Sequence, residues 1–273
     1  MAGQVFVSGG SGYIAGFLIR QLIEEGWRVH TSIRNLAREE EVRRWIDTDN
    51  SKLRFFQADL MSDAGWAEAI AGCSHVAHVA SPLPSNAPKS DDDLIIPARE
   101  GALRALRFAK DAGVKRFVLT SSVAAVAYGH DRNREHFTEA DWTNIDSPDA
   151  YAYVKSKTIA ERAARDWVAA NAPDMEFVTV NPSLVLGPLL APDFSTSLEA
   201  IKKLLDAGIK LEQVRKVFEY LRQHVTTDIA AAHIVVMVLD AHGEVAEQDA
   251  SVLGIALERG RALLIAVNKW DGI

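Results

Sequence analysis

Short apolar runs alternate with longer amphipathic stretches from residue 4 to about residue 182. The runs with the length of buried strands are QVFVSG (4–9), RVHTSI (28–33), LRFFQA (53–58), HVAHVA (75–80), RFVLTSS (116–122) and FVTVNP (177–182). Helical patterns separate them, at 14–22, 35–46, 64–72, 97–113 and from about 149 onward. Such alternation is typical of a parallel sheet covered by helices. The pattern therefore predicts an α/β fold with a doubly wound parallel sheet.

Two stretches within this pattern set expectations for packing. In the first helical stretch Ile14, Phe17, Leu18 and Leu22 share one face, which we expect to cover the sheet. The segment SPLPSNAPKSDDD, residues 81–93, is rich in Pro, Ser and Asp. That composition predicts an exposed loop after the fourth strand.

Composition narrows the classes of partner. The formal net charge is −7, which disfavours an electrostatic grip on nucleic acid or on an anionic membrane surface. Cys73 is the single cysteine, so no internal disulfide can form, and we expect it to be a small buried residue. The chain begins without a basic flank before an apolar run, and no uninterrupted apolar run reaches membrane length. These features predict a cytoplasmic protein that does not bind membranes.

A glycine-rich turn joins the first strand to the first helix in VFVSGGSGYIAGFL. Gly9, Gly12 and the small Ala15 have the spacing of a dinucleotide-binding turn. Glycine permits the tight turn and the close approach of a diphosphate, and the helix amino terminus offers free N–H groups. Tyr13 and Ile14 begin that helix and are expected beside the cofactor. The turn predicts a Rossmann-like dinucleotide site.

The end of the second strand indicates which dinucleotide binds. NAD-specific sites usually place a carboxylate there for the ribose 2′-hydroxyl, whereas this chain offers Ser32 and Arg34. A guanidinium suits the 2′-phosphate of NADP, so NADP is the predicted cofactor and NAD the less favoured one. The alternative is that Arg34 is an ordinary surface residue. Asp59, followed by Leu60, could bind the adenine amino group or could cap a helix.

The stretch DAYAYVKSKTIAE contains two tyrosine–lysine pairs at helical spacing, Tyr151 with Lys155 and Tyr153 with Lys157. A phenol has a pKa near about 10 and is a poor acid or base at neutral pH. An adjacent ammonium lowers that pKa, so the phenol could protonate a carbonyl oxygen as hydride reaches the carbon. A serine hydroxyl at a strand end could hold the same oxygen. The residue types needed for carbonyl reduction are therefore present.

Six motifs in order carry a resemblance: VSGGSGYIAG, ADL, HVASP, LTSSVAAVAYG, YVKSKTIAE and VNPSLVLGP. Over residues 3–205 the chain resembles extended short-chain dehydrogenases/reductases. It is most similar to dihydroflavonol-reductase-like and aldehyde-reductase-like members of the NAD-dependent epimerase/dehydratase group. The family pattern Y-x-x-S-K-x-x-A-E selects Tyr153 as the acid/base and Lys157 as its partner. Tyr151 and Lys155 then become bystanders.

The resemblance also implies the remaining site residues. Ser122 would be the catalytic serine, with Ser121 the less favoured choice, and His78 would be structural rather than a metal ligand. No metal site is expected. The residues that would line the cofactor are Val79, Ala80, Ser81, Pro182 and Ser183.

The chain departs from the family beyond about residue 205. Residues 208–223 and 247–260 have helical patterns, 233–241 is an apolar strand or buried helix, and a strand begins at 261. Asp228 and His233 still match a family segment. We therefore expect a domain over 1–190 that binds NADP, and an atypical, truncated or replaced α/β lobe over 191–273.

Residues 236–273 also resemble part of the second G domain of tandem-domain ribosome-assembly GTPases. In that family Asn268, Lys269 and Asp271 would read guanine. A GTPase also needs G-x-x-x-x-G-K-[ST] to hold phosphates, and the sequence contains none. A structural βαβ element is the preferred interpretation, which makes the chain chimeric.

Together these observations favour an NADPH-dependent reductase of an aldehyde or ketone, with a small-molecule carbonyl substrate. The alternative is an NAD(P)-binding protein of the same group that is catalytically impaired, since an incomplete substrate lobe would leave the site open to water. A GTPase-like fragment is a third, disfavoured, hypothesis. Family members often pair through the helix that carries the tyrosine and lysine, so the resemblance allows a homodimer.

Overall fold

The computed structural model divides into two compact units, Met1–Ser183 and Leu184–Ile273. The described residues are 3–82, 88–131, 134, 137–138, 140–183, 185, 190–191, 234–240 and 262–268. No helix among those residues has both the length and the apolar composition that a membrane span requires.

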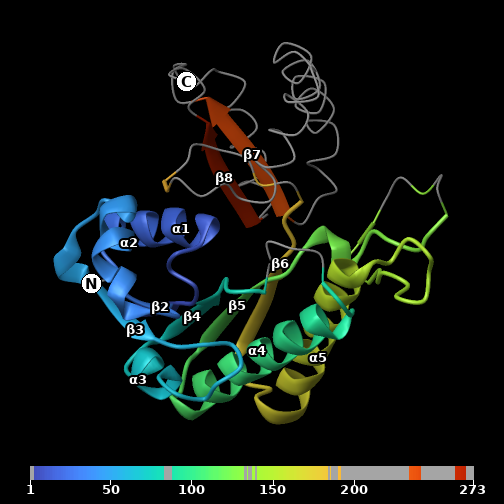
Figure 1. Cartoon of the computed structure of the whole chain (residues 1–273), viewed down its shortest axis with the longest axis horizontal. Coiled ribbons are helices and arrows are strands. Elements are labelled where there is room, and N and C mark those ends of the chain that lie inside the picture. The colour runs from blue at the N-terminus through green and yellow to red at the C-terminus, as the bar shows by residue number, and fades with distance from the viewer. Residues whose placement is uncertain are drawn as a thin grey trace. The chain divides into compact units, whose positions relative to one another are not determined.

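The first unit is built on a six-stranded parallel sheet (Figure 1). Its strands lie at β1 Gln4–Val7, β2 Arg28–Ile33, β3 Leu53–Gln57, β4 His75–His78, β5 Arg116–Thr120 and β6 Glu176–Val180. Their order across the sheet is β3-β2-β1-β4-β5-β6, and every neighbouring pair is parallel. The predicted doubly wound fold is therefore confirmed. The order reverses between β1 and β4, and such a switch point opens a crevice at the carboxyl ends of the strands.

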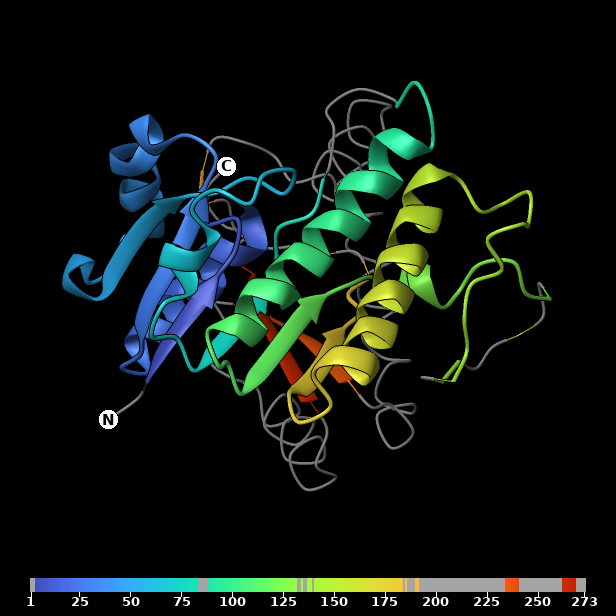
Figure 2. The ribbon, with the colours of Figure 1, turned by 90° about the horizontal axis from the view of Figure 1, so that it is seen from below.

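Helices cover both faces of this sheet. In chain order the α-helices are α1 Tyr13–Glu24, α2 Glu39–Ile46, α3 Trp66–Ile70, α4 Asp92–Asp111 and α5 Ala152–Asn171, and the 3-10 turns are η1 Leu36–Arg38, η2 Asn50–Lys52 and η3 Val123–Ala125. Helices α1 and α2 lie on one face, and α3, α4 and α5 lie on the other (Figure 1). Helices α4 and α5 run side by side (Figure 2).

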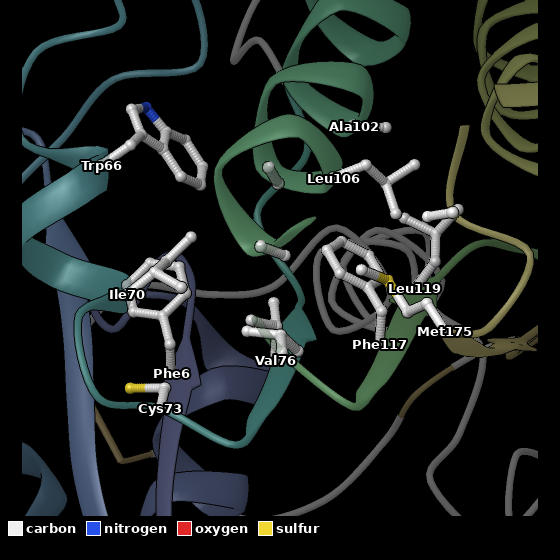
Figure 3. Close-up of a cluster of buried hydrophobic side chains, with 14 of the residues drawn as sticks. Phe6, Trp66, Ile70, Cys73, Val76, Ala102, Leu106, Phe117, Leu119 and Met175 are labelled. Atoms are coloured by element: carbon white, nitrogen blue, oxygen red, sulfur yellow. The ribbon is translucent and has the colours of Figure 1, made fainter. Parts of the chain in front are cut away.

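Alternation along β1 divides the core into two clusters. Phe6 points into the cluster under α3, α4 and α5, whereas Val5 and Val7 point into the cluster under α1 and α2. In the first cluster the rings of Phe6 and Trp66 meet edge to face with centroids 5.9 Å apart (Figure 3). Cys73 is buried in that cluster, as expected for a small apolar residue.

The face of α1 that packs on the sheet agrees only in part with the prediction: Leu18 and Leu22 pack against the cluster under α1 and α2, as expected, but they are only partly buried. Ala15, Ile19 and Ile23 are fully buried, whereas Ile14 and Phe17 are only partly buried. The small side chain of Ala15 lets the helix approach the sheet closely at its first turn. With the helix this close, Ala15, Ile19 and Ile23, which are spaced by four along the chain, point toward the core. The larger side chains of Ile14 and Phe17 lie at the margin of the buried face.

The fourth helix begins earlier than predicted. Helix α4 starts at Asp92, so that Pro97, the expected first residue, lies inside it. The carboxylate of Asp93 accepts the backbone N–H groups of Lys89 and Ser90. Acidic residues also favour the positive end of a helix. These interactions offset the hydrogen bond that Pro97 cannot donate.

The second unit contains one described element, a two-stranded parallel sheet of β7 Ile234–Asp240 and β8 Ala262–Asn268. Residues 234–240, within the segment expected to be an apolar strand or a buried helix, therefore form a strand. The helices expected at 208–223 and 247–260 lie outside the described residues. The same is true of Asp228, His233, Lys269 and Asp271.

Candidate active site

The glycine turn lies at the switch point of the sheet. Gly9 has φ +73°, and a Cβ placed on it would lie 3.0 Å from the Cβ of Ala80, at the end of β4. The N–H of Gly9 donates to the Ser32 hydroxyl at 3.2 Å, so Ser32 supports the turn from the end of β2. Gly12 is the N-cap of α1 and supplies no side-chain cap. The backbone N–H groups in the first turn of α1 have no acceptor within the helix. Because the N-cap residue is glycine, no side chain of that residue accepts them either.

A buried hydrogen-bond network joins the ends of β1 and β4. The hydroxyl oxygen of Ser8 accepts the N–H groups of Val79 and Ala80, both at 2.9 Å, and lies 3.0 Å from Nδ1 of His78. Since the oxygen already accepts two bonds, its proton is donated to Nδ1 and the His78 proton is on Nε2. Burial lowers the pKa of His78 to about 3, so the ring is neutral. The network fits the structural role expected for His78 and orders the backbone of two predicted cofactor residues.

Lys157 is a buried cation on α5. Only 8% of the residue is exposed, and its ammonium donates to the hydroxyl of Ser81 at 3.0 Å. Burial lowers its pKa from 10.5 to about 8, because the charged form loses solvation. The same ammonium lies 5.6 Å from the centre of the Tyr153 ring. The structure therefore brings three predicted residues together at the carboxyl end of β4.

Ser122 lies two residues beyond the last residue of β5. It is the N-cap of η3, where its hydroxyl oxygen accepts the N–H of Ala124 at 3.1 Å. Its proton is directed at the carbonyl of Pro182 over a long 3.5 Å contact. Ala124 belongs to the small apolar cluster against which the Tyr153 ring packs. Ser122, Tyr153 and Lys157 thus all lie on elements that follow β5 along the chain, Ser122 at the start of η3 and the other two on α5.

The second tyrosine–lysine pair is engaged elsewhere. Tyr151 is 57% exposed, and burial of its ring edge together with a hydrogen bond to Tyr128 raises its pKa to about 12. It is therefore a weaker acid than an ordinary tyrosine. The Tyr151 ring stacks on Tyr153 with centroids 6.4 Å apart, so Tyr151 contacts the site without having the same surroundings. Lys155 forms an ion pair with Asp91 at 2.8 Å, which joins the amino-terminal ends of α4 and α5.

Ser121 and Ser122 have different surroundings. Among the described residues, the Ser121 hydroxyl is the buried side-chain oxygen without a hydrogen-bond partner. It lines a cavity together with His78, Lys157 and Glu161. The space that the centre of a water molecule can reach is about 20 Å³, enough for one water. Ser121 therefore faces a small cavity that Lys157 also lines.

The remaining predicted cofactor residues follow the carboxyl ends of β2, β3 and β6. Arg34 is exposed directly after β2. The carboxylate of Asp59 accepts the N–H of Met61 at 2.8 Å, a local turn contact related to the capping alternative, and Leu60 packs against the core. Pro182 is buried and its carbonyl accepts the N–H of Val123 at 3.1 Å, and Ser183 is exposed.

The sequence alone did not reveal four residues that organise this site: Ser8, Glu161, Arg165 and Asn181. Glu161 was recognised only as the last residue of the family pattern, without a role. Ser8 and Asn181 adjoin predicted residues along the chain, whereas Glu161 and Arg165 do not. The bonds from Ser8 to Val79 and from Asn181 to Glu161 join residues that are distant in sequence, so no local pattern in the sequence signals them.

Known proteins show the same combination of fold and motifs. The chain is 39% identical over 211 residues to cinnamoyl-CoA reductase CAD2 of Medicago truncatula, covering 75% of this chain and 64% of that protein. It is 34% identical over 204 residues to dihydroflavonol 4-reductase of Hordeum vulgare, covering 72% of this chain and 57% of that protein. It thus spans less than two thirds of the length of these two relatives.

A solved structure shares the fold. Yeast methylglyoxal/isovaleraldehyde reductase Gre2, complexed with NADPH, superposes with a TM-score of 0.66 at 29% identity, covering 74% of this chain and 66% of that one. These relatives give no support to the GTPase resemblance of residues 236–273. The model of the NAD dependent epimerase/dehydratase family matches residues 5–247, beyond the 3–205 that the motifs covered. The chain belongs to the NAD dependent epimerase/dehydratase family.

Proposed function

We propose that this chain is an NADPH-dependent reductase that converts a small aldehyde or ketone to an alcohol. The observation that carries the proposal is the buried ammonium of Lys157 beside the Tyr153 ring, on helix α5, which packs against the sheet that bears the glycine turn. The named relatives are reductases, and the Gre2 structure contains NADPH, which supports the same chemistry here.

The residues of the crevice fit a dinucleotide. The positive φ of Gly9 and its close approach to Ala80 leave no room for a side chain in the turn, and the amino terminus of α1 would hold the diphosphate. Arg34 would bind the 2′-phosphate, Lys157 the nicotinamide ribose, and Pro182 would contact the nicotinamide. When bound, NADPH supplies the hydride.

The protein's own groups would manage the proton. The phenol of Tyr153 would protonate the substrate oxygen as the carbonyl becomes an alcohol. The ammonium of Lys157 stabilises the phenolate that remains. The Ser122 hydroxyl would orient the substrate oxygen, and its long contact to Pro182 is weak enough to be exchanged for a substrate bond.

The test compares two tyrosines on one helix. We expect the wild-type chain to oxidise NADPH with at least one member of an aldehyde and ketone panel. Tyr153→Phe should lower kcat by about 10²- to 10⁴-fold while NADPH still binds, because only the proton donor is lost. Tyr151→Phe is the matched control and should keep kcat.

Two results would contradict the proposal. NADPH binding without oxidation across the panel would favour the alternative, a cofactor-binding protein without turnover. Full activity in Tyr153→Phe would show that another group donates the proton.

A homodimer that pairs through α5 remains a prediction from the family resemblance. Sedimentation equilibrium of the purified chain would measure its mass in solution. A monomer at all concentrations would contradict the prediction.

A further inference from the structure

A buried carboxylate connects separate parts of the proposed site. Glu161 on α5 is 3% exposed. One of its oxygens accepts two bonds from Arg165, at 3.0 and 2.8 Å. The other accepts a bond from the side-chain amide of Asn181 at 2.9 Å. Because Asn181 follows β6, this carboxylate joins helix α5 to the end of the sheet.

Asn181 uses both of its amide donors. Its Nδ2 also donates to the backbone carbonyl of Ser122 at 3.1 Å. Carboxylate and carbonyl oxygens only accept hydrogen bonds, so the orientation of the Asn181 amide is determined by its two partners. The Ser122 carbonyl additionally accepts the N–H of Ala125 at 2.9 Å, which is the first bond of η3. Asn181 therefore holds the start of the turn whose N-cap is Ser122.

Backbone bonds hold the residues on either side of Ser122. The N–H of Ser121 donates to Val180 at 2.8 Å, and that of Val123 donates to Pro182 at 3.1 Å. These bonds align the ends of β5 and β6. The Asn181 side chain adds a link from this junction to helix α5, which the backbone bonds do not provide.

The same helix carries the proposed acid/base. Glu161 lies one turn beyond Lys157 on one face of α5, and both residues line the cavity behind Ser121. A slide or rotation of α5 relative to β5 would therefore break the Glu161–Asn181 bond. This bond restrains the distance between the Ser122 hydroxyl and the Tyr153 phenol.

We infer that Glu161 and Asn181 form a positioning pair, which fixes Ser122 relative to Tyr153 and so aligns the substrate oxygen for protonation. The inference rests on the proposed reductase function. Neither residue needs to touch substrate or cofactor, because the pair acts through the backbone of Ser122. A small misplacement of an orienting group can lower a rate by about 10²-fold.

An exchange of donor and acceptor tests the pair. Glu161→Gln and Asn181→Asp should each lower kcat and the unfolding temperature. In the double variant the introduced glutamine amide can donate to the introduced aspartate carboxylate, which restores the link between α5 and the sheet. An ionised aspartate, however, has no N–H to give to the Ser122 carbonyl.

The double variant separates a positioning role from a structural one. We expect it to recover most of the unfolding temperature, while kcat stays about tenfold to a hundredfold below wild type and NADPH affinity changes little. Glu176→Gln is the control for Glu161→Gln, because it also replaces a paired glutamate by glutamine. It removes only the exposed ion pair with Arg116 and should keep kcat. Full recovery of kcat in the double variant would overturn the inference.

A second measurement uses the residue through which the pair acts. In a Ser122→Ala background, adding Asn181→Asp should lower kcat no further, since the group being positioned is already gone. Additive losses, or failure of every variant to fold and bind NADPH, would assign the pair to folding and overturn the inference. A wild-type chain that oxidises no NADPH would instead refute the proposed function.

Discussion

Replacement of Lys157 by methionine should stabilise the cofactor-free protein while it removes activity. Burial moves the pKa of this lysine from 10.5 to about 8, and each unit corresponds to about 1.4 kcal/mol. Holding the ammonium inside the fold therefore costs about 3 kcal/mol. Loss of the hydrogen bond to Ser81 offsets about 1 kcal/mol of that gain. We expect Lys157→Met to raise the free energy of unfolding by about 2 kcal/mol at pH 7.

The gain depends on pH with a defined sign. Below the folded pKa of about 8 the lysine is charged in both states, so the burial cost is fully present. Between that value and 10.5 the unfolded chain binds the proton while the folded chain releases it, so wild-type stability rises with pH. The advantage of methionine should therefore be largest at pH 7 and shrink as the pH rises through this window.

Urea unfolding followed by tryptophan fluorescence measures this difference, because Trp270 alone of the six tryptophans lies beyond residue 183. Lys155→Met is the matched control on the same helix. Its partly exposed ion pair with Asp91 contributes less than about 1 kcal/mol, and its loss should leave kcat unchanged. A Lys157→Met protein less stable than wild type at pH 7, or a gain independent of pH, would refute the reasoning.

Three further predictions concern the reaction and the cofactor. The kcat for carbonyl reduction should fall as the pH rises through about 8, where Lys157 loses its proton; a pH–rate profile that is flat across this value would contradict the assignment. Gly9→Ala should weaken NADPH binding and destabilise the fold by about 1 kcal/mol or more. Gly113 also has a positive φ, but no atom lies near an added Cβ, so Gly113→Ala should change stability only. Equal effects of the two variants in NADPH titrations would count against the role of the glycine turn. Arg34→Ala should weaken NADPH binding about tenfold or more and leave NADH binding unchanged, because a charge-assisted bond to the 2′-phosphate is lost; calorimetry showing the same change for both cofactors would disprove the 2′-phosphate role.

The strands and the glycine turn could be predicted because their signals are local. Each strand is a short apolar run, and the turn depends on residues only three apart along the chain. The predicted packing face of α1 was only partly right, with Leu18 and Leu22 at the margin of the buried face, because hydrophobicity alone does not reveal how closely a helix approaches a sheet. Ala15 contributes little to an apolar face, yet its small size decides which line of residues is buried.

The reactive pair in the site could also not be identified from local spacing alone. Tyr151 with Lys155 and Tyr153 with Lys157 have identical spacing, so spacing could not distinguish them. The fold does so by burying Lys157 and placing Lys155 beside Asp91. The bonds of Ser8 to the end of β4 were equally invisible, since about 70 residues separate the partners.

All proposed reactive groups, from the glycine turn to Ser183, belong to the first compact unit. A substitution after residue 183 would therefore leave every group proposed for hydride and proton transfer in place along the chain. The two segments of sequence can thus vary separately, one carrying the proposed chemistry and the other lying outside it.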